Sequence, residues 1–379
     1  MPTHRALRIG TDCSGMEAPV QALRNLNVKF VQAFSCDIDP AAQATIKANF
    51  PHGTMYTDIT TRDNAETPSV DIYVAGFPCQ PFSSAGKKGG FEDSLGRGQI
   101  FFYVLDYLQK KSPKVFVLEN VKMLQHLKKG RYFAAIQEAL HKLDKYNIST
   151  KILETKEHGI PHNRARTYIV GIRKDVDRGT FDFPKPIPCA PLSLFLEPRP
   201  KVSRESLVRA LPPASQGNAR KVVVLAKRKL RREGSDPLDD FVVDCDSTPR
   251  FSKTKLGVSP CITCGRKQGH WLTSRGRRMY KTEMMRLQGM DPTNFKVVVS
   301  DLKLGHQLGN TMSVNVLERL FIELLPAAGL VHGPLRDRWA DGSAVKALAS
   351  SRSVRFAKRF VAMGKYARTA KAKRAARTA

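Results

Sequence analysis

A cysteine between two prolines is the first residue that could do chemistry. Cys79 lies in GFPCQPFSSAG, which continues from the apolar run DIYVAG. Such a run is typical of a buried strand, and strands of a parallel sheet deliver the residues that follow them to its binding edge. A buried structural cysteine is the alternative interpretation. The polar, glycine-rich neighbourhood favours a presented thiol, which needs a depressed pKa or a nearby base to act as a nucleophile.

A carboxylate is expected beside that cysteine. A second apolar run, KVFVLEN, ends at Glu119 and Asn120, which places Glu119 at the same sheet edge as Cys79. A thiol and a carboxylate without a neighbouring histidine differ from a thiol protease, in which histidine is the base. The pair suits an electrophile that must be protonated or hydrogen-bonded while sulfur attacks, and an aromatic nitrogen heterocycle is such a target.

Two arginines form the next candidate group. Arg164 and Arg166 stand in HNRAR, just ahead of another strand-like run. They would bracket one polar group or bind successive anionic groups. The alternative is a solvated basic turn.

A small-residue turn, GTDCSGMEA, follows the first strand-like run and precedes a helical pattern. A doubly wound sheet binds nucleotide-like ligands at such a turn. Asp37, some 22 residues after Gly15, could hydrogen-bond a ribose. Alternatively, Asp37 and Asp39 cap the helix that follows. Asp58 could accept a hydrogen bond from an adenine amino group, or cap a loop.

Strand-like and helical patterns alternate through the first half of the chain. Strands are predicted at Leu7–Gly10, Lys29–Phe34, Asp71–Ala75, Val115–Leu118 and Tyr168–Gly171. Helices are predicted over Ala18–Leu26, Pro40–Asn49, Gln99–Lys111 and Arg131–Leu143. This alternation indicates βαβ units and an α/β fold around a parallel sheet.

The charge balance points to a polyanionic partner. The 379 residues carry 63 lysines and arginines against 34 aspartates and glutamates, a net charge of +29, and nucleic acid is the simplest such partner. No apolar run reaches the roughly 18 residues of a membrane span, and the N-terminus lacks a signal-peptide core. Seven scattered cysteines do not form a disulfide framework, so we expect reduced thiols in an intracellular compartment.

Composition changes divide the chain further. Prolines crowd residues 184–200 and predict a domain connection. The region after it is basic, with no clear helix or strand pattern. Cys261 and Cys264 form a lone CxxC, too few ligands to predict a metal site. We expect one domain over 1–184, a smaller region after it, and a basic tail over 331–379 outside the folded core.

The motifs together resemble those of the cytosine-5 DNA methyltransferases. GTDCSGMEA, GFPCQPFS, LENV, HNRAR, RLQG and QLGN occur in that order between residues 7 and 325. The resemblance implies a Rossmann-like, S-adenosylmethionine-binding α/β domain with a mostly parallel sheet. It also implies that 1–184 is the catalytic domain and that 185–300 is a smaller target-recognition domain. The segment 301–330, with a last helix within 312–325, would return to the catalytic domain.

The resemblance also implies a mechanism. Cys79 would attack carbon 6 of a cytosine flipped out of double-stranded DNA, because the stacked ring cannot be reached. Glu119 would contact ring nitrogen 3 and the exocyclic amine. Arg166 would hold the base carbonyl oxygen, and Arg164 would lie nearby on a phosphate or a loop. Carbon 5 would take the methyl group from S-adenosylmethionine.

Matching positions imply the cofactor contacts. These are Cys13, Ser14, Gly15, Met16 and Glu17 in the first loop, Asp37 for the ribose, Ile38 for packing on the adenine, Asp58 and Ile59 for the adenine, and Asn310 and Thr311 on the late cofactor-side segment. The first loop departs from the family, which usually has phenylalanine at position 13 and more glycines at positions 17 and 18.

Two alternatives stay open. A tRNA cytosine-5 methyltransferase of the same fold would carry Cys-Phe-Thr after the ENV motif, whereas KMLQHLKKG follows here. A catalytically silent DNA-binding relative would not need an intact Cys79, Glu119 and Arg166. The protein would be nuclear in a eukaryote, and otherwise cytoplasmic or in the nucleoid.

Overall fold

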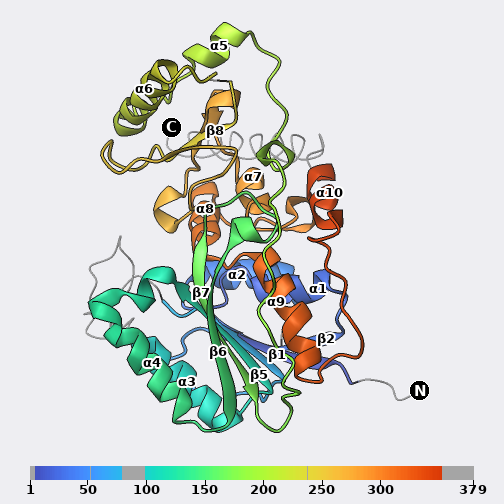
Figure 1. Cartoon of the computed structure of the whole chain (residues 1–379). Coiled ribbons are helices and arrows are strands. Elements are labelled where there is room, and N and C mark those ends of the chain that lie inside the picture. The colour runs from blue at the N-terminus through green and yellow to red at the C-terminus, as the bar shows by residue number, and fades with distance from the viewer. Residues whose placement is uncertain (1–4, 52, 79–98, 237, 352–379) are drawn as a thin grey trace, which may run out of the picture.

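The computed structural model describes residues 5–51, 53–78, 99–236 and 238–351. At its centre is a seven-stranded sheet in the order β3-β2-β1-β4-β5-β7-β6 (Figure 1). The strands are β1 (Leu7–Asp12), β2 (Phe30–Cys36), β3 (Thr54–Tyr56), β4 (Ile72–Ala75), β5 (Val115–Val121), β6 (Tyr146–Glu154) and β7 (Ala165–Arg173). The pairs among β1 to β5 are parallel, whereas β7 runs antiparallel to both β5 and β6. The predicted α/β fold on a mostly parallel sheet is confirmed.

The five predicted strands are all present, and β6 is the long strand that the pattern missed. It lies at the edge of the sheet, and its sequence, YNISTKILE, is mostly half-buried or exposed. An edge strand needs no continuous apolar run, so the signal used for the central strands is absent there.

Side chains of the central strands alternate between two hydrophobic cores. One core joins Ile9 and Val117 to helices α1 (Ala18–Asn25) and α9 (Val314–Ala327). The other joins Phe34 and its neighbours to α3 (Ile100–Lys111) and α4 (Arg131–His141). Gly10 permits this packing, because a Cβ there would lie 2.1 Å from the Phe34 ring. Helix α2 (Pro40–Asn49) follows β2.

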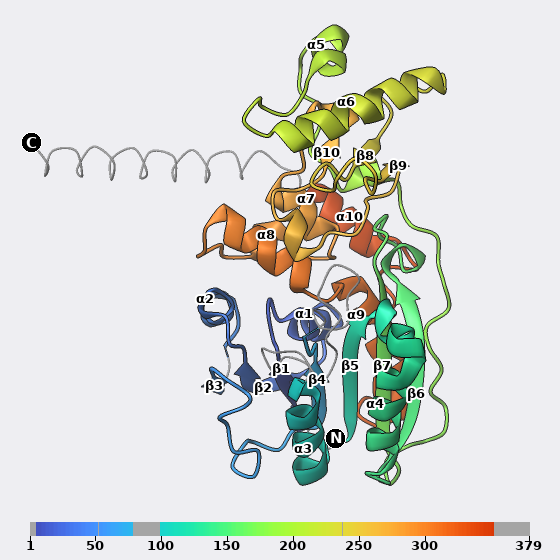
Figure 2. The same ribbon diagram turned by 90° about the vertical axis from the view of Figure 1, so that its left-hand side faces the viewer.

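A second, four-stranded sheet builds the smaller part of the molecule (Figure 2). Its order is β11-β10-β8-β9, with β8 (Phe241–Val243), β9 (Thr254–Leu256), β10 (Trp271–Leu272) and β11 (Arg277–Arg278). Helix α5 (Arg204–Arg209) precedes α6 (Gly217–Arg232). Val222 and Val223 of α6 pack against Val243 and Trp271. The region without a predicted pattern is therefore folded, and its many lysines and arginines had obscured the apolar stripe of α6.

The chain end corrects the predicted tail. After α7 (Lys281–Arg286), α8 (Asp301–Asn310) and α9, the chain adds α10 (Ser343–Ser350). Trp339, Val345 and Leu348 belong to the same core as α1 and α9. The prediction that this stretch lies outside the folded core is wrong up to Ser351, because three spaced apolar side chains anchor an otherwise polar segment. Residues 352–379 lie outside the described residues.

Among the helices that the structure describes, none combines the length and the apolar character that crossing a bilayer would require.

Candidate active site and cofactor site

The ends of β4 and β5 lie side by side at the carboxyl edge of the sheet. Ala75 pairs with Leu118, so Gly76 and Glu119 are neighbours. A Cβ on Gly76 would lie 2.8 Å from Met312 Cε, the end of a flexible side chain, and 3.9 Å from Glu119 Oε2, so position 76 adjoins both side chains. Asn120 Nδ2 donates to the Phe77 carbonyl at 3.2 Å and fixes the start of the loop. The predicted nucleophile, Cys79, lies two residues further on, outside the described residues.

Glu119 and Arg166 meet across two antiparallel strands. Glu119 pairs with Tyr168 and Val121 with Arg166, so the two charged residues are diagonal neighbours on one face of the sheet. Arg166 Nε lies 3.1 Å from Glu119 Oε1. Burial raises the pKa of Glu119, although Arg166 and Arg164 oppose the shift. The site thus holds a buried carboxyl group whose charge is partly balanced by one guanidinium.

Arg164 is buried among backbone carbonyls. Arg164 is only 2% exposed. Its guanidinium donates to the carbonyls of Ile262 at 2.9 Å, Gly309 at 3.2 Å and Thr311 at 2.6 Å. Arg164 therefore ties three segments together. Of the two predicted places, the loop is right and the phosphate is wrong, because so deeply buried a guanidinium cannot reach a phosphate. The alternative of a solvated basic turn is also wrong.

Cys261 is a site residue that sequence reasoning missed. Its sulfur lies 3.9 Å from Arg164 Nη1 and 3.9 Å from Arg166 Nη2. Burial alone would raise the pKa of the Cys261 thiol, but Arg166 and Arg164 outweigh it, so the pKa is lowered.

The segment that carries Cys261 is held in register with the arginine motif. Ser259 N donates to the Pro161 carbonyl at 2.8 Å, and Ile262 N to His162 Nε2 at 3.0 Å. The CxxC spacing gave no hint of this contact. Within the described part of the chain, no cluster of three or more metal-ligating side chains occurs.

The turn after β1 is shaped by alternating left-handed residues. Cys13, Gly15 and Glu17 have φ of 51°, 55° and 52°. Ser14 Oγ lies 3.0 Å from the Thr11 carbonyl and 3.1 Å from the Cys36 carbonyl, and it accepts from Cys36 N at 3.1 Å, which joins the turn to the end of β2. Its side chain is therefore occupied within the protein.

Asp37 links the turn to β2. Its Oδ2 accepts from Gly15 N at 2.8 Å and its Oδ1 from Asp39 N at 2.9 Å. Asp39, in contrast, is the N-cap of α2, because its side chain accepts from Ala41 N. The capping interpretation is thus right for Asp39, whereas Asp37 stays at the sheet edge, where burial raises its pKa.

Met16 and Glu17 cannot touch a ligand with their side chains, since both residues are 0% exposed. Thr11 Oγ1 and Gln32 Nε2 each donate to Glu17 Oε1 at 2.9 Å. Burial raises the pKa of Glu17 to about 7. The prediction that the side chains of Met16 and Glu17 contact the cofactor is wrong. Both side chains instead support the turn from the protein interior.

The predicted adenine side has both an exposed and a buried part. Ile38 is 72% exposed and Ile59 is 5% exposed. Asp58 Oδ1 accepts from the backbone and the hydroxyl of Thr60, both at 2.8 Å, so the loop-capping interpretation holds for that oxygen. Asp58 also lines a cavity of about 340 Å³, together with Tyr56. Neither Asp37 nor Ile38 lines that cavity. What fits a nucleoside at the ends of β2 and β3 is the exposed apolar side chain of Ile38 with the carboxylates of Asp37 and Asp58.

Asn310 and Thr311 contribute less to the cofactor site than predicted. Asn310 is exposed, with Nδ2 3.5 Å from His306 Nδ1. Thr311 is 4% exposed and gives its carbonyl to Arg164. Asn310 can face a ligand, whereas the side chain of Thr311 is packed inside the protein.

A buried ion pair beneath the cofactor turn was not predicted. Asp12, at the end of β1, binds both terminal nitrogens of Arg62, at 2.7 and 2.8 Å. The hydroxyl of Tyr73 also donates to Asp12, and Arg62 lies over the rings of Phe34 and Tyr56. Asp12 belongs to the GTDCSGMEA motif, but its partner Arg62 lies 50 residues further along the chain. The spacing of the motif therefore could not predict the ion pair.

Solved structures share this architecture. A methyltransferase of Entamoeba histolytica superposes with a TM-score of 0.58 at 16% identity, covering 85% of this chain and 99% of that one. The Dnmt2 methyltransferase of S. pombe gives a TM-score of 0.57 at 19% identity, with coverage of 85% and 99%. At these identities the likeness concerns the fold.

Sequence relatives carry the assignment further. The model of the C-5 cytosine-specific DNA methylase family matches residues 13–325. The Type II methyltransferase M1.ScrFI of Lactococcus lactis subsp. cremoris is 35% identical over 309 residues, 78% of this chain and 72% of the relative. M.HpaII of Haemophilus parainfluenzae is 32% identical over 324 residues, 81% and 86% of the two chains. The chain therefore belongs to the C-5 cytosine-specific DNA methylases and is a DNA cytosine methyltransferase with S-adenosylmethionine as its methyl donor.

Proposed function

We propose that this chain methylates carbon 5 of a cytosine rotated out of double-stranded DNA, with Cys79 as the covalent nucleophile. The observation that carries the proposal is the buried Glu119–Arg166 pair, next to the strand end that leads into the Cys79 loop. A carboxyl and a guanidinium on one face match the nitrogen edge and the carbonyl oxygen of cytosine. Stacked bases do not expose that edge to a buried site, so the base must leave the helix.

The residues divide the chemistry among them. The Cys79 thiolate adds to carbon 6, while Glu119 hydrogen-bonds nitrogen 3 and the exocyclic amine, and Arg166 holds the carbonyl oxygen. A raised pKa lets Glu119 keep or deliver a proton as negative charge develops on the ring. S-adenosylmethionine supplies the methyl group that carbon 5 accepts. Loss of the carbon-5 proton and elimination of the Cys79 thiolate then restore the aromatic ring and the enzyme.

The cofactor would lie across the ends of β1, β2 and β3. The Asp37 carboxylate, which already accepts two backbone N–H groups, has lone pairs left for ribose hydroxyls. Exposed Ile38 would pack on the adenine, and Asp58 would accept from its amino group. Cys13, Gly15 and Asn310 would flank the rest, while Ser14, Met16, Glu17, Ile59 and Thr311 hold the site in shape.

The smaller part of the molecule supports a duplex as substrate. On α6, one face packs on the small sheet and the opposite face is exposed and basic, with Arg220, Lys221, Arg228, Lys229, Arg231 and Arg232. A 16-residue helix is about 24 Å long, so its basic face can reach several phosphates of a duplex. We assign residues 185–300 to target recognition on this basis.

The test is methyl transfer from labelled S-adenosylmethionine to duplex DNA and, separately, to tRNA. We expect labelled duplex, with bisulfite sequencing locating 5-methylcytosine. Cys79→Ser should abolish transfer and covalent trapping by a 5-fluorocytosine duplex while binding survives, because a hydroxyl is a far poorer nucleophile. Transfer to tRNA alone would replace the proposal with the RNA alternative, and normal turnover by the variant would remove Cys79 from the mechanism.

A further inference from the structure

The stretch between β5 and α4 contains an unusual backbone. It consists of two short 3-10 turns, Lys122–Gln125 and Leu127–Gly130. Lys128 has φ 50° and ψ 44°, and Lys129 has φ 57° and ψ 34°. Gly130 follows with φ 85°. Three consecutive residues are therefore left-handed, and two of them are lysines.

This conformation is unfavourable for lysine. In the left-handed region the Cβ crowds the following carbonyl oxygen, and glycine or asparagine is the usual occupant. The other non-glycine residues with positive φ in the described chain, such as Asn27, Ser112 and Asp144, are not adjacent to one another. Buried Leu124 and Leu127 hold the turn in place from the second core. Glycine or asparagine would adopt this backbone with less strain. The presence of two lysines therefore needs an explanation.

The turn is also a block of one charge. Between Asn120 and Gln137 the chain has Lys122, Lys128, Lys129 and Arg131 and no acidic residue. Lys128 and Lys129 are both exposed. In the part of the chain that the structure describes, no carboxylate lies within ion-pair distance of either ammonium group. The two charges are therefore presented outward and available to an anion.

The turn lies at the active-site edge of the sheet. Strand β5 delivers Glu119 to that edge and continues directly into the turn. In Figure 1 the stretch between β5 and α4 lies at the end of the sheet that faces the smaller part of the molecule. An anion bound by the lysines would therefore be close to the base that Glu119 is proposed to hold.

We propose that Lys128 and Lys129 form a preorganised phosphate clamp for the DNA substrate, which the strained turn holds in its binding direction. The inference rests on the proposed function and adds a contact outside the base pocket and outside the α6 face. A fixed backbone leaves less conformational freedom to lose on binding. Glycine or asparagine would relieve the backbone strain, but neither carries the positive charge of lysine. The strain is therefore kept at both positions.

The test is a double variant that relaxes the backbone and removes the charge, Lys128→Asn with Lys129→Asn. Asparagine tolerates left-handed φ, so the midpoint of thermal unfolding should rise by a few degrees. Duplex binding should weaken roughly tenfold at low salt, and the log–log salt slope should fall by about 1.8, since each lost phosphate contact removes about 0.9. The charge-preserving pair Lys128→Arg and Lys129→Arg should keep wild-type binding.

Lys142→Asn is the control at a right-handed position, where the ammonium forms an exposed ion pair of little net stability with Glu138. Lys142 is an exposed lysine at the other end of α4, with a right-handed φ of −61°. It should change neither the unfolding midpoint nor the salt slope.

Three outcomes would overturn the clamp. The first is an unchanged salt slope in the double variant, with or without a stability gain. The second is equal weakening by Lys142→Asn. The third is weakened binding to an acidic polypeptide but not to duplex, which would identify a protein partner. If the double variant does not fold, Lys128→Asn and Lys129→Asn are measured singly. Each should then lower the salt slope of duplex binding by about 0.9, and an unchanged slope in both would overturn the clamp. Failure of the wild-type protein to methylate or bind duplex at all would instead count against the proposed function.

Discussion

Arg166 is held at several points of its guanidinium, including a 2.8 Å hydrogen bond from Nη1 to the Ala165 carbonyl. Glu119 Oε1 lies 3.1 Å from Nε, and the Cys261 sulfur lies 3.9 Å from Nη2. Glu119 and Cys261 come from different parts of the chain, Glu119 from β5 and Cys261 from the segment between β9 and β10. The geometry of the base site therefore depends on a residue outside the recognised motifs.

Cys261→Ala should lower the single-turnover rate of methyl transfer about fivefold, because Arg166 loses a hydrogen-bond acceptor worth about 1 kcal/mol. The dissociation constants for duplex and cofactor should stay unchanged. Cys261→Ser should restore part of the rate. Cys264→Ala removes a half-buried thiol three residues later and serves as the control. Equal rate losses in both variants would show that Cys261 does not position Arg166.

Asp37 and Asp39 allow a paired test of the cofactor site. Asp37→Ala should weaken S-adenosylmethionine binding by about 1–3 kcal/mol, through loss of a charged hydrogen-bond acceptor and of the Gly15 contact. Asp39→Asn should leave the affinity unchanged, because asparagine is an equally good N-cap. Calorimetry without DNA measures both constants. An unchanged constant for Asp37→Ala would move Asp37 from the binding site to the scaffold.

At the scale of elements, α6 shows how charge can hide a helix. Its buried residues are spaced at helical intervals, Ala219, Val222, Val223, Ala226 and Leu230. Lys227 interrupts the stripe, yet its ammonium is satisfied by the carbonyls of Val208 and Ala210 at 2.9 and 2.6 Å. The helix thus anchors α5 from one side and presents its basic face on the other.

Replacing Lys221, Arg228 and Arg232 with glutamine should lower the salt slope of duplex binding by about 2.7, or about 0.9 for each lost phosphate contact. The unfolding midpoint should stay near that of the wild type, because the three side chains are exposed. Lys110→Gln combined with Lys142→Gln, on α3 and at the end of α4, tests for a general charge effect. A similar slope in the triple variant and the wild type would remove α6 from the duplex contact.

At the scale of the whole molecule, the C-terminal segment closes the core. Trp339 is 4% exposed and lies against Gly159, where a Cβ would come within 3.0 Å of its ring. Arg319 of α9 reaches Asp337 at 2.9 Å and the ring of His158 at 2.7 Å. The segment therefore joins α9 to the connection that follows β6.

Trp339→Ala should lower the free energy of unfolding by about 3–5 kcal/mol, the usual cost of emptying a buried aromatic site. Deletion of residues 335–379 should be at least as damaging. Urea unfolding followed by fluorescence provides the measurement. If the deletion variant unfolds at the same urea concentration as the full chain, the packing of this segment contributes nothing.

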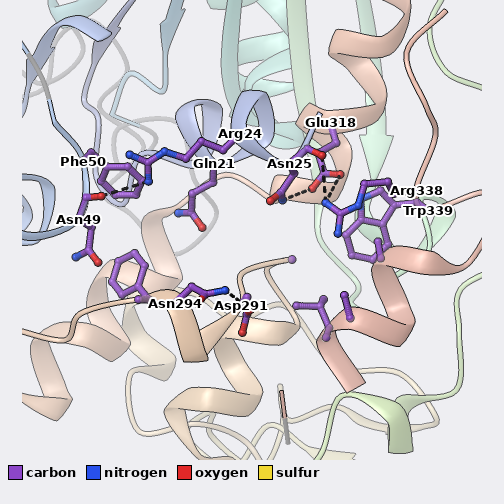
Figure 3. Close-up of a pocket in the computed structure, with 15 residues that line it drawn as sticks. Gln21, Arg24, Asn25, Asn49, Phe50, Asp291, Asn294, Glu318, Arg338 and Trp339 are labelled. Atoms are coloured by element: carbon purple, nitrogen blue, oxygen red, sulfur yellow. Dashed lines mark hydrogen bonds and ion pairs between the residues drawn. The ribbon is translucent and has the colours of Figure 1, made fainter. Parts of the chain in front are cut away.

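The same segment covers a buried carboxyl group (Figure 3). Glu318 of α9 accepts from Asn25 Nδ2 at 2.6 Å and lies 3.8 Å from Arg338 Nη1, at the side of a cavity of about 350 Å³. Burial raises its pKa to about 7. Between the ordinary glutamate value of 4.5 and that pKa, the folded chain holds more protons than the unfolded chain. Stability therefore falls as the pH rises through this range.

Glu318→Gln should stabilise the protein by about 2–3 kcal/mol at pH 8 and have little effect at pH 5. The amide oxygen can still accept from Asn25 and carries no charge to bury. Some pH dependence should remain, because burial also raises the pKa of Glu17 to about 7. Urea unfolding at the two pH values checks the sign. A variant that is less stable at pH 8 would show that the Arg338 pair outweighs burial.

The sequence by itself determined the central sheet and the identity of the motif residues. Buried parallel strands need continuous apolar runs, and the residue after each run must appear at the sheet edge, so the sequence alone places Glu119 and Asp37 there. Local spacing also limited the choices for Asp39 and Asp58. The edge strand β6 and helix α6 were not predicted, because neither has an uninterrupted apolar pattern.

Only the tertiary structure decided which of those residues act and which support. Arg164 and Arg166 look equivalent two residues apart, yet one is buried among carbonyls and the other faces Glu119. Cys261, Arg62 and Trp339 gain their roles from partners far away in the chain. Local patterns report periodicity and turn chemistry, whereas burial and long-range contacts depend on how distant segments pack, which the spacing of residues does not encode.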